Sequence, residues 1–551
     1  MKIRISLFAF FTGLMSAAFT VSATPETDRE NDCLRPVRPG GVDGRAWWNG
    51  QSVMFLYPPS FDFKPVADAV RYHYVVEASD RLTYAFWAKK PNEALTPIWA
   101  RLPTGFVRLE VLGVMPNGRV LGVAGSRRFW KSAPFSDAVC PKPACGYGEA
   151  ARAYYDWLFA MKNTQMLVRS VETDEYYLYN TYPAKTEAAI VQAMIRYATL
   201  RPDRKDDALA AARHAADFLL GCSNPPGSPL EHFPHTYRVL RPEASRKGVT
   251  SEEYAGQNML IYPATAGRAY LALYGVVGDE KYLRAAVRIA ETYRRLQGSD
   301  GTWYLKLWEK DGTPVNENRL LPFAVCDFLE DLHAETKDES YRAMSDRAFA
   351  FVEKGPLVTW NWEGQFEDVK PSKPYRNLTI HPPCSAALHL LRRYPDDLTK
   401  RALARECLRF AEDQFVAWCP PFDVEGRGPI SGDTTMFPCV KKADWYDVPG
   451  ALEQYDWYLP IDSSAAKIAS VFLAFYRKEG RETDLLKAKA LGNAVTQMQK
   501  IAGNGAIPTH WVPWDVKTDE KHWINCGIGT AAFLERLEEL SRGVGACGAV
   551  D

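Results

Sequence analysis

From residue 148 onward, apolar residues recur at the period of an α-helix. Five amphipathic segments each carry an alanine at the same point of the pattern, and five more apolar segments each begin at a proline. Proline suits the first position of a helix, because its missing N–H would have no partner there. The two series alternate, which predicts repeated helix pairs. The alanines are Ala216, Ala290, Ala348, Ala411 and Ala494, and the prolines are Pro183, Pro263, Pro322, Pro382 and Pro460.

A first helix near residues 148–162 and a last near 525–541 bring the predicted total to twelve. The proline-started helices are the more apolar, and a short link joins each of them to the charged, alanine-marked helix that follows. This pattern predicts an (α/α)6 toroid over residues 148–541, with an inner ring of buried helices and an outer ring of amphipathic ones. The alternative is an open α-solenoid, whose repeats would be more evenly spaced and whose loops would be short on both faces.

Residues 40–136 follow a different pattern. Short segments alternate between apolar and polar positions and are separated by Pro-Asn-Glu and Pro-Asn-Gly turns, which predicts β-strands. The order of strands and turns resembles a fibronectin III-like β-sandwich. Residues 137–147, which are rich in proline and glycine, are the expected linker to the helical domain.

The first 23 residues have the features of a cleavable signal peptide. A short basic start at Lys2 and Arg4 precedes a largely apolar run from Leu7 to Phe19, and small residues end at Ala23. A membrane anchor is the alternative, but the run is shorter than the ~20 residues that span a bilayer. We therefore expect a bacterial protein that is periplasmic or secreted, with no membrane span.

The composition narrows the range of partners. With 67 Lys+Arg against 67 Asp+Glu, the chain has no net charge to attract nucleic acids or anionic lipids, so any anion must be bound at a local site. The 11 cysteines form no zinc pattern, and no nucleotide-binding loop follows a strand. We expect no metal and no cofactor. Two cysteine pairs are close enough in sequence to form disulfides, Cys140 with Cys145 and Cys419 with Cys439.

The long links between helix pairs all lead into the starts of inner helices, so they are expected to gather on one face of the toroid. They contain nine of the 16 tryptophans, namely Trp303, Trp308, Trp360, Trp362, Trp445, Trp457, Trp511, Trp514 and Trp523. Tryptophan is large and apolar for a loop residue, so these side chains are candidate platforms for sugar rings. The alternative is that they only hold the long loops together.

Polar residues gather in the same links, and His381 stands directly before Pro382, at the mouth of an inner helix. Converging helix N-termini also favour an anionic group near the axis. The expected ligand is therefore the carboxylate of a uronic acid. The candidate substrate-binding residues are Tyr254, Asn318, Arg319, Arg376, Asn377, Tyr455, Tyr458, His510 and Trp511. For Asp462, we prefer a helix-capping role.

Three segments carry a family resemblance: LEQYDWYLPID at 452–462, NLTIHPP at 377–383 and AIPTHW at 506–511. Together with the leader and the twelve-helix pattern, they resemble the toroidal glycosidases and lyases that degrade uronate-containing polysaccharides. The chain is most similar to glycoside hydrolase family 154, over about residues 40–541. This resemblance implies an exo-acting β-glucuronidase, and it assigns no catalytic residue.

Three functions are compatible with these features. A glycosidase needs two carboxyl groups, for which Glu453 and Glu253 are the expected pair, and the aromatic surroundings of Glu453 favour a general acid. A structural hydrogen bond is the alternative role for Glu453, and the acid would then be Glu253, Glu363 or Glu367. A polysaccharide lyase would instead draw its base and the groups that neutralise the uronate from Tyr375, Arg376, Asn377 and His381, with Tyr254 as a further candidate for the base. The third possibility is a glycan-binding protein without catalysis.

Overall fold

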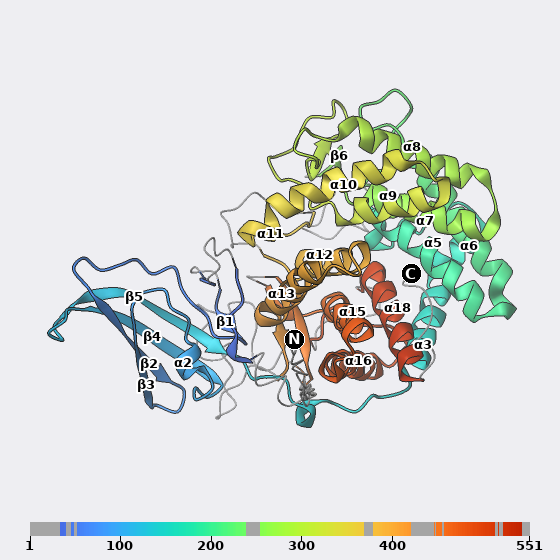
Figure 1. Cartoon of the computed structure of the whole chain (residues 1–551). Coiled ribbons are helices and arrows are strands. Elements are labelled where there is room, and N and C mark those ends of the chain that lie inside the picture. Colours follow the sequence, from blue (N-terminus) through green and yellow to red (C-terminus); the bar gives the residue numbers. More distant parts are fainter. Residues whose placement is uncertain are drawn as a thin grey trace, which may run out of the picture.

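The structure is a computed structural model that describes residues 33–39, 46–48, 52–238, 254–367, 378–419, 446, 448–454, 457–512, 516 and 522–542. Its N-terminal part is a β-sheet, which lies beside a ring of helices (Figure 1). The predicted signal peptide, residues 1–23, lies outside the described residues.

The N-terminal sheet has five strands in the order β1-β5-β4-β2-β3. Strand β1 runs parallel to β5, and the other neighbours are antiparallel. The strands fall where the alternating pattern predicts them. Their bounds are Met54–Phe55 for β1, Arg71–Ala78 for β2, Thr83–Ala88 for β3, Gly105–Val114 for β4 and Val120–Lys131 for β5.

The predicted fibronectin III-like sandwich needs a correction, because the described residues of this region form a single sheet. One face of the sheet is buried, and no second sheet covers it in the described residues. The segment around Phe55 and Phe61 and the short helix α2 (Thr96–Trp99) cover it, and aromatic rings of both pack on Phe129. The other face keeps Trp87 51% exposed. Alternation specifies that one face of a strand is buried, but it does not specify what covers that face.

The inner ring consists of six helices that each begin at the end of a long link. Each packs on the next, and the last packs on the first, so the ring is closed. This closure excludes the open solenoid. The inner helices are α5 (Pro183–Leu200), α7 (Tyr262–Val277), α9 (Phe323–Thr336), α12 (His381–Arg393), α15 (Asp462–Glu479) and α18 (Ile524–Ser541).

The outer ring pairs one helix with each inner helix, as predicted. Short turns join the pairs, as where α7 ends at Val277 and the next helix begins at Glu280, so each pair is an antiparallel hairpin and all inner helices start at one face. The outer helices are α3 (Tyr147–Ala160), α6 (Lys205–Gly221), α8 (Glu280–Leu296), α10 (Glu339–Lys354), α13 (Leu398–Phe415) and α16 (Glu482–Ala502). Helix α3 pairs with α18 and joins the two ends of the ring.

Short elements occupy the links. In the described residues they are α4 (Lys162–Arg169), α11 (Pro356–Thr359), the 3-10 helix Leu178–Thr181 and five short strands: β6 (Gln257–Met259), β7 (Lys306–Trp308), β8 (Val416–Ala417), β9 (Gly450–Gln454) and β10 (Trp457–Pro460). The sequence pattern predicts that Pro460 starts an inner helix. In the structure, Pro460 instead ends strand β10, two residues before α15 begins. Asp462 is not a helix cap either. Its buried carboxylate accepts a hydrogen bond from Thr530 Oγ1 at 3.0 Å, which links α15 to α18.

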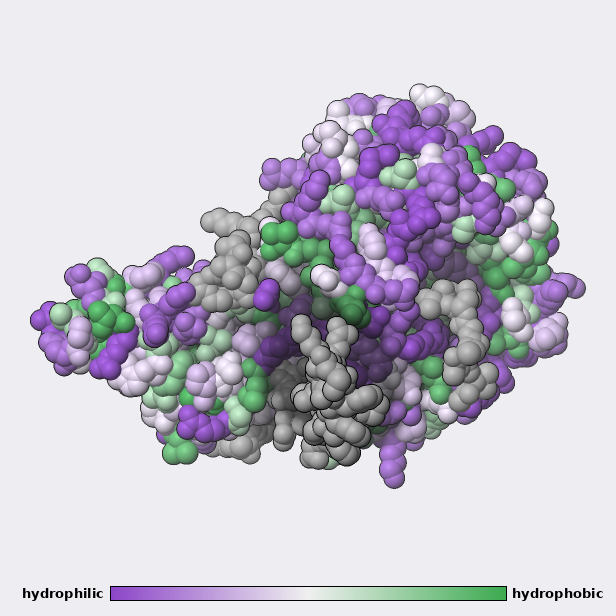
Figure 2. Space-filling view, in the orientation of Figure 1, coloured by the Kyte–Doolittle hydropathy of each residue, from purple (hydrophilic) through white to green (hydrophobic). Residues whose placement is uncertain are grey.

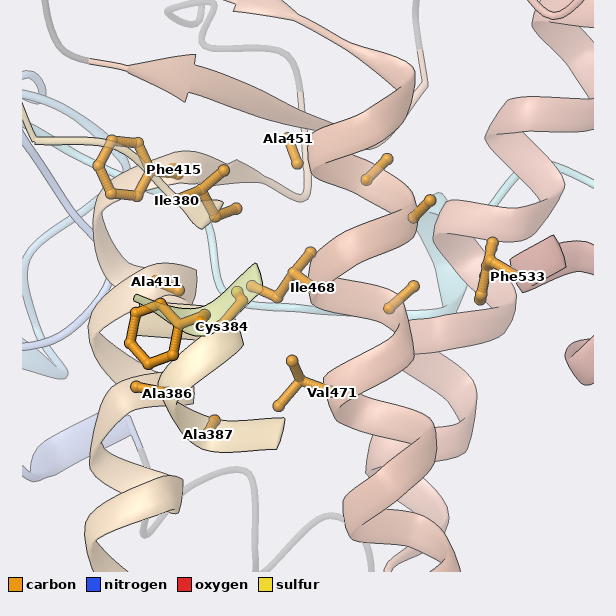
Figure 3. Packing of buried hydrophobic residues seen from close by; sticks show 14 of the residues in the cluster. Ile380, Cys384, Ala386, Ala387, Ala411, Phe415, Ala451, Ile468, Val471 and Phe533 are labelled. Atoms are coloured by element: carbon orange, nitrogen blue, oxygen red, sulfur yellow. The ribbon is translucent and has the colours of Figure 1, made fainter. Parts of the chain in front are cut away.

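Small side chains let the two rings approach closely. Figure 3 shows Cys384, Ala386 and Ala387 of α12 near Ala411 and Phe415 of α13, and these residues are fully buried. On the face that Figure 2 shows, the surface of the ring is mostly hydrophilic. None of the helices in the described residues is long and apolar enough to cross a membrane. Cys145 is a free thiol, which corrects the predicted disulfide between Cys140 and Cys145, and Cys439, the predicted partner of Cys419, lies outside the described residues.

The sheet domain is bound to the ring through α13. Asp413 is fully buried and accepts hydrogen bonds from the N–H groups of Leu56 and Tyr57, both at 2.7 Å. The ring of Trp48 stacks on Phe410 with centroids 5.6 Å apart. Apolar and polar contacts therefore both fix the sheet against the helices.

Candidate functional site

A cavity of about 2110 Å³ lies on the axis of the ring. Residues at the start of all six inner helices line it: Tyr182, Tyr262, Phe323, His381, Ser463 and Asn525. Because the inner helices start at one face, the N-terminal ends of their macrodipoles converge on this end of the cavity. The long links add Tyr254, Glu367, Glu453, His510 and Trp523.

Glu367 is a carboxyl group at this end of the cavity that several contacts hold in place. Its Oε1 pairs with Lys185 Nζ at 2.9 Å and accepts a short hydrogen bond from the Tyr262 hydroxyl. Its main-chain carbonyl accepts a short hydrogen bond from Lys306 Nζ. Only 13% of the Glu367 side chain is exposed. Two inner helices and the β7 strand thus fix a residue that lies in a long link.

The charge states around Glu367 follow from these contacts. Burial by itself raises the pKa of Glu367, but the charge of Lys185 and the hydrogen bond from Tyr262 outweigh burial and lower the pKa below its usual value. Burial and the charge of Glu367 raise the pKa of Tyr262 well above its usual value. At neutral pH, Glu367 is therefore ionised and Tyr262 is a hydrogen-bond donor.

Aromatic rings surround Lys185. Its ammonium lies 3.9 Å from the ring centroid of Trp523, 5.6 Å from that of Tyr182 and 5.8 Å from that of Tyr262. Rings at these distances stabilise the cation and exclude water from its ion pair. Lys185 is thereby held in its ion pair with Glu367. The exposed part of Trp523 forms a wall of the cavity.

Glu453 and His381 lie next to each other in the fold. Glu453 is part of β9, and its main-chain carbonyl accepts a hydrogen bond from the N–H of Ile380 at 3.4 Å, directly before His381. Both residues line the cavity and are half-buried. Burial, together with the charge of Lys467, lowers the pKa of His381 to about 3. The imidazole is therefore neutral at physiological pH and is not a cation for a carboxylate.

The structure brings together four of the residues predicted from the sequence: Glu453, His381, Tyr254 and His510 all line the cavity. It places others elsewhere. Arg319 does not line the cavity, because its guanidinium pairs with Asp300 and packs over Tyr304 at 4.2 Å. Asn318 lies beside it in the same link. The remaining predicted residues, Glu253, Tyr375, Arg376, Asn377 and Tyr455, lie outside the described residues, as does the side chain of Tyr458.

Most of the loop tryptophans that the structure describes are not sugar platforms. Trp303, Trp360, Trp362 and Trp511 are at most 4% exposed and pack within the protein, so for them the alternative role of holding the loops together is the correct one. Trp523 is the member of the group that lines the cavity. A large apolar ring in a long loop is found more often inside the fold than on its surface, which the sequence pattern does not reveal.

Two tyrosines of the site share a sequence signal with His381. Tyr182 and Tyr262 precede Pro183 and Pro263, the same position that His381 holds before Pro382. In all three cases the residue before the proline faces the axis. The sequence offers Glu367 only as a substitute for Glu453, because no local pattern distinguishes it from other acidic residues of the links.

No group of three or more His, Cys, Asp or Glu side chains within the described ranges is arranged to hold a metal ion. The carboxyl groups, the neutral imidazole and the aromatic rings are therefore the chemistry that the described residues offer. Such a set can bind a sugar ring and transfer protons at its substituents.

Comparisons with known proteins give distant likenesses only. No protein-family model and no curated protein matches the chain. Among solved structures, the cellobiose 2-epimerase of Spirochaeta thermophila has a TM-score of 0.46 at 13% identity and covers 68% of this chain and 89% of its own. A family 76 glycoside hydrolase from a bovine Bacteroides thetaiotaomicron strain has a TM-score of 0.42 at 10% identity, with coverages of 86% and 95%.

An unsaturated glucuronyl hydrolase specific for heparin is similar to the same extent, with a TM-score of 0.42 at 10% identity and coverages of 72% and 97%. At these TM-scores, no activity is transferred from any of these proteins to this chain.

Proposed function

We propose that the protein is a carbohydrate-active enzyme that hydrolyses glycosidic bonds of uronic-acid-containing glycans, as an exo-acting β-glucuronidase. One observation carries the proposal: Glu367 and Glu453 line the same cavity, and the contacts of Glu367 keep it ionised. Glycosidases need one ionised and one protonated carboxyl group on either side of the bond that breaks. With Glu253 outside the described residues, Glu367 takes its place as the partner of Glu453.

In this proposal, Glu367 attacks the sugar or activates a water molecule, and Glu453 protonates the leaving oxygen. Tyr262 holds the Glu367 carboxylate in place by donating a hydrogen bond to it. His381, as a neutral imidazole beside Glu453, binds a sugar hydroxyl group. The ring of Trp523 offers a stacking surface for the sugar. A cavity enclosed by a ring of helices favours the end of a glycan chain over its middle, which supports exo action. The leader at residues 1–23 supports secretion to the periplasm or the cell exterior.

The test compares Glu367→Gln and Glu453→Gln with the wild type on an aryl β-glucuronide. Glutamine keeps the shape of glutamate but neither ionises nor donates a titratable proton, so each variant should lose roughly 100-fold or more in turnover. Glu309→Gln is the matched control. Glu309 is a half-buried carboxylate of another link that pairs with His235 at 2.7 Å and does not line the cavity.

The products separate the alternatives. Hydrolysis of a glucuronate-capped oligosaccharide releases a reducing sugar, whereas a lyase produces an unsaturated uronate that absorbs in the ultraviolet, and a binding protein produces neither. The melting temperature of Glu453→Gln should stay close to that of the wild type, whereas Glu367→Gln leaves Lys185 without its ionic partner and should melt earlier. If Glu453→Gln melts much earlier and yet retains turnover, then Glu453 is a structural anchor and the proposed pair is wrong.

A further inference from the structure

The axial cavity extends far below the helix starts. Helix α15 contributes residues along its length to the lining, at a spacing of three or four: Ser463, Lys467, Ser470, Ala474 and Arg477. At 1.5 Å per residue, this stripe covers about 21 Å. The cavity therefore follows the axis of the ring through the molecule, and the two carboxyl groups of the site lie at one end of it.

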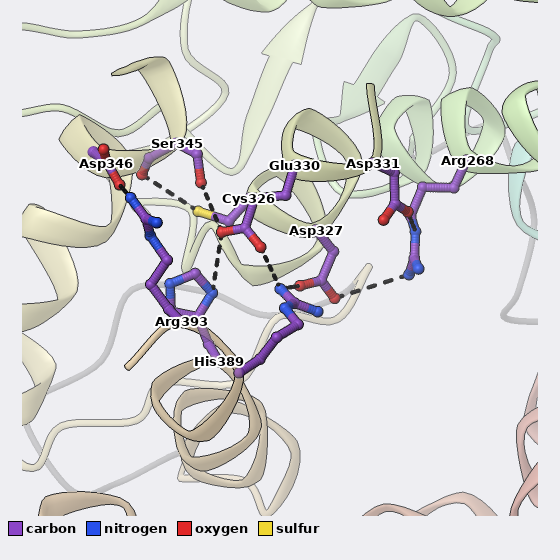
Figure 4. Close-up of polar contacts among 10 residues, drawn as sticks. Arg268, Cys326, Asp327, Glu330, Asp331, Ser345, Asp346, His389 and Arg393 are labelled. Carbon is purple, nitrogen blue, oxygen red and sulfur yellow. Dashed lines mark hydrogen bonds and ion pairs between the residues drawn. The ribbon is translucent and has the colours of Figure 1, made fainter. Parts of the chain in front are cut away.

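Two of the cations that line this interior are neutralised by an ion-pair network, shown in Figure 4. The guanidinium of Arg268 pairs with Asp331 at 2.6 Å. That of Arg392 pairs with Glu330 at 2.9 Å and also with Asp327. These pairs join α7, α9 and α12 across the ring, so the charges of Arg268 and Arg392 serve the fold.

Lys467 and Arg536, two further cations of the cavity lining, have no such partner among the described residues. In the part of the chain that the structure describes, Lys467 forms no hydrogen bond and no ion pair. The guanidinium of Arg536 donates a hydrogen bond to Ser470 Oγ at 3.2 Å, and no carboxylate of the described residues lies within ion-pair distance of it. Both side chains line the cavity and keep accessible surface there.

Lys467 and Arg536 lie close together. Ser470, which Arg536 contacts, is three residues after Lys467 on α15, and residues at this spacing lie on one face of a helix. Arg536 comes from α18, which packs on α15. Burial is the largest effect on the pKa of Lys467 and lowers it, the charge of Asp327 raises it, and the charge of Arg536 contributes a smaller lowering. Lys467 is half-buried and Arg536 is exposed. The charges of Asp327, Glu535 and Glu539 act on them without forming an ion pair, so a bound anion would add the direct charged partner that both cations lack.

We propose that Lys467 and Arg536 bind the carboxylate of a terminal uronate that enters the cavity. This inference rests on the proposed function, which supplies the uronate as substrate. Lys467 lies five residues inside α15, about 7.5 Å below the helix start. A terminal sugar that lies against the two glutamates would place its acidic group toward this pair. The sequence also offers Arg319 and His381 as cations for this carboxylate. Arg319 lies outside the cavity, and the imidazole of His381 is neutral.

The variants are chosen to separate charge from shape. Lys467→Met removes the charge and keeps the length of the side chain, and Lys467→Arg keeps the charge. Arg268→Met is the matched control, because it removes a neutralised cation from the same cavity. Lys467→Met should melt no earlier than the wild type, since it leaves no partner unpaired. Arg268→Met should melt earlier, because it leaves Asp331 without its partner.

The measurement is equilibrium binding of free glucuronate and of glucose by calorimetry. We expect Lys467→Met to weaken glucuronate binding by roughly 10- to 100-fold with little effect on glucose, because charge-assisted hydrogen bonds are lost. Lys467→Arg should keep most of the preference, and Arg268→Met should keep all of it. Unchanged glucuronate binding in Lys467→Met, an equal loss for both sugars, or no glucuronate binding by the wild type would overturn the inference.

Binding is measured without turnover, so the two proposals fail separately. If glucuronate binds in a Lys467-dependent manner but no glycoside is hydrolysed, the proposed hydrolysis is wrong and the anion site stands. If aryl β-glucuronide is hydrolysed equally well by the wild type and Lys467→Met, the hydrolase stands and the anion site is wrong.

Discussion

Glu187 is a fully buried carboxyl group one turn into α5, outside the cavity lining. Its Oε1 accepts a hydrogen bond from Asn163 Nδ2 at 3.4 Å, and its Oε2 has no partner in the described part of the chain. Burial raises the pKa of Glu187 to about 8, although the hydrogen bond from Asn163 and the charge of Arg238 oppose it. The native protein therefore keeps this carboxyl group protonated at neutral pH.

The protonated state of Glu187 predicts how stability depends on pH. Its pKa in the folded protein is above the unfolded value of 4.5, so between 4.5 and about 8 the folded chain holds a proton that the unfolded chain releases. The stabilising contribution is complete below pH 4.5 and is lost as the pH rises toward 8, at about 1.4 kcal/mol per pH unit. Glu187→Gln resembles the protonated acid and should flatten this dependence.

Thermal or urea unfolding at pH 5, 6.5 and 8 measures the difference between the wild type and Glu187→Gln. Asp413, whose pKa burial raises to about 7, titrates in both proteins, so a shared slope remains. The difference between the stability curves of the wild type and Glu187→Gln therefore measures the contribution of Glu187. Parallel curves across this range would show that Glu187 is already ionised in the folded protein.

At the scale of elements, glycine controls how closely the inner helices pack. Gly267 lies in the middle of α7, and a Cβ atom at this position would be 2.4 Å from Cε2 of Phe328 on the neighbouring helix α9. Phe328 is fully buried, so its ring cannot move aside without a shift of the helix. A side chain at position 267 would thus push apart two neighbours in the closed ring.

Gly267→Ala should therefore destabilise the protein by about 1–3 kcal/mol through overpacking. Gly275→Ala, on the same helix, is the control, since a Cβ atom there would meet nothing within 4 Å. That substitution should stabilise the protein by about 0.5–1 kcal/mol, because alanine is the better helix former. Denaturant unfolding of both variants measures the contrast, and equal effects would contradict the close approach of α7 and α9.

At the scale of the whole molecule, the sheet domain is an integral part of the protein and not a mobile appendage. Asp413 satisfies two main-chain N–H groups of the sheet domain, and Trp48 and Phe135 cover the rings of Phe410 and Trp418. Removal of the sheet domain would expose those two rings to water. The carbonyl groups of the linker at Pro141 and Lys142 also accept hydrogen bonds from α16.

A chain that begins at Gly146 should therefore be less soluble than the whole protein and should melt at a lower temperature. In the full-length protein, Asp413→Ala leaves two buried N–H groups without an acceptor and should cost about 2–4 kcal/mol. Solubility and thermal melting measure both effects. A shortened chain that is soluble, melts cooperatively at the normal temperature and keeps its activity would show that the sheet domain is an accessory.

The sequence by itself determined the helical ring. Helical periodicity, prolines before inner helices and short links within pairs are local features, and local features predicted twelve helices, their alternation and the face on which the links gather. The same local signal placed His381 at the mouth of an inner helix, because the residue before the helix-start proline faces the axis. It also marked the strands of the N-terminal domain, since alternation identifies a strand whatever covers it.

Only the tertiary structure decided which side chains meet. Glu367 is held by Lys185, which lies 182 residues earlier in the chain, and no periodic pattern connects the two positions. Tertiary contacts also decide what covers the sheet and which four loop tryptophans are buried. They likewise decide that Arg268 has an ionic partner and Lys467 has none among the described residues. Periodicity specifies the face of an element that turns inward, but the path of a long link depends on contacts between residues far apart in the chain.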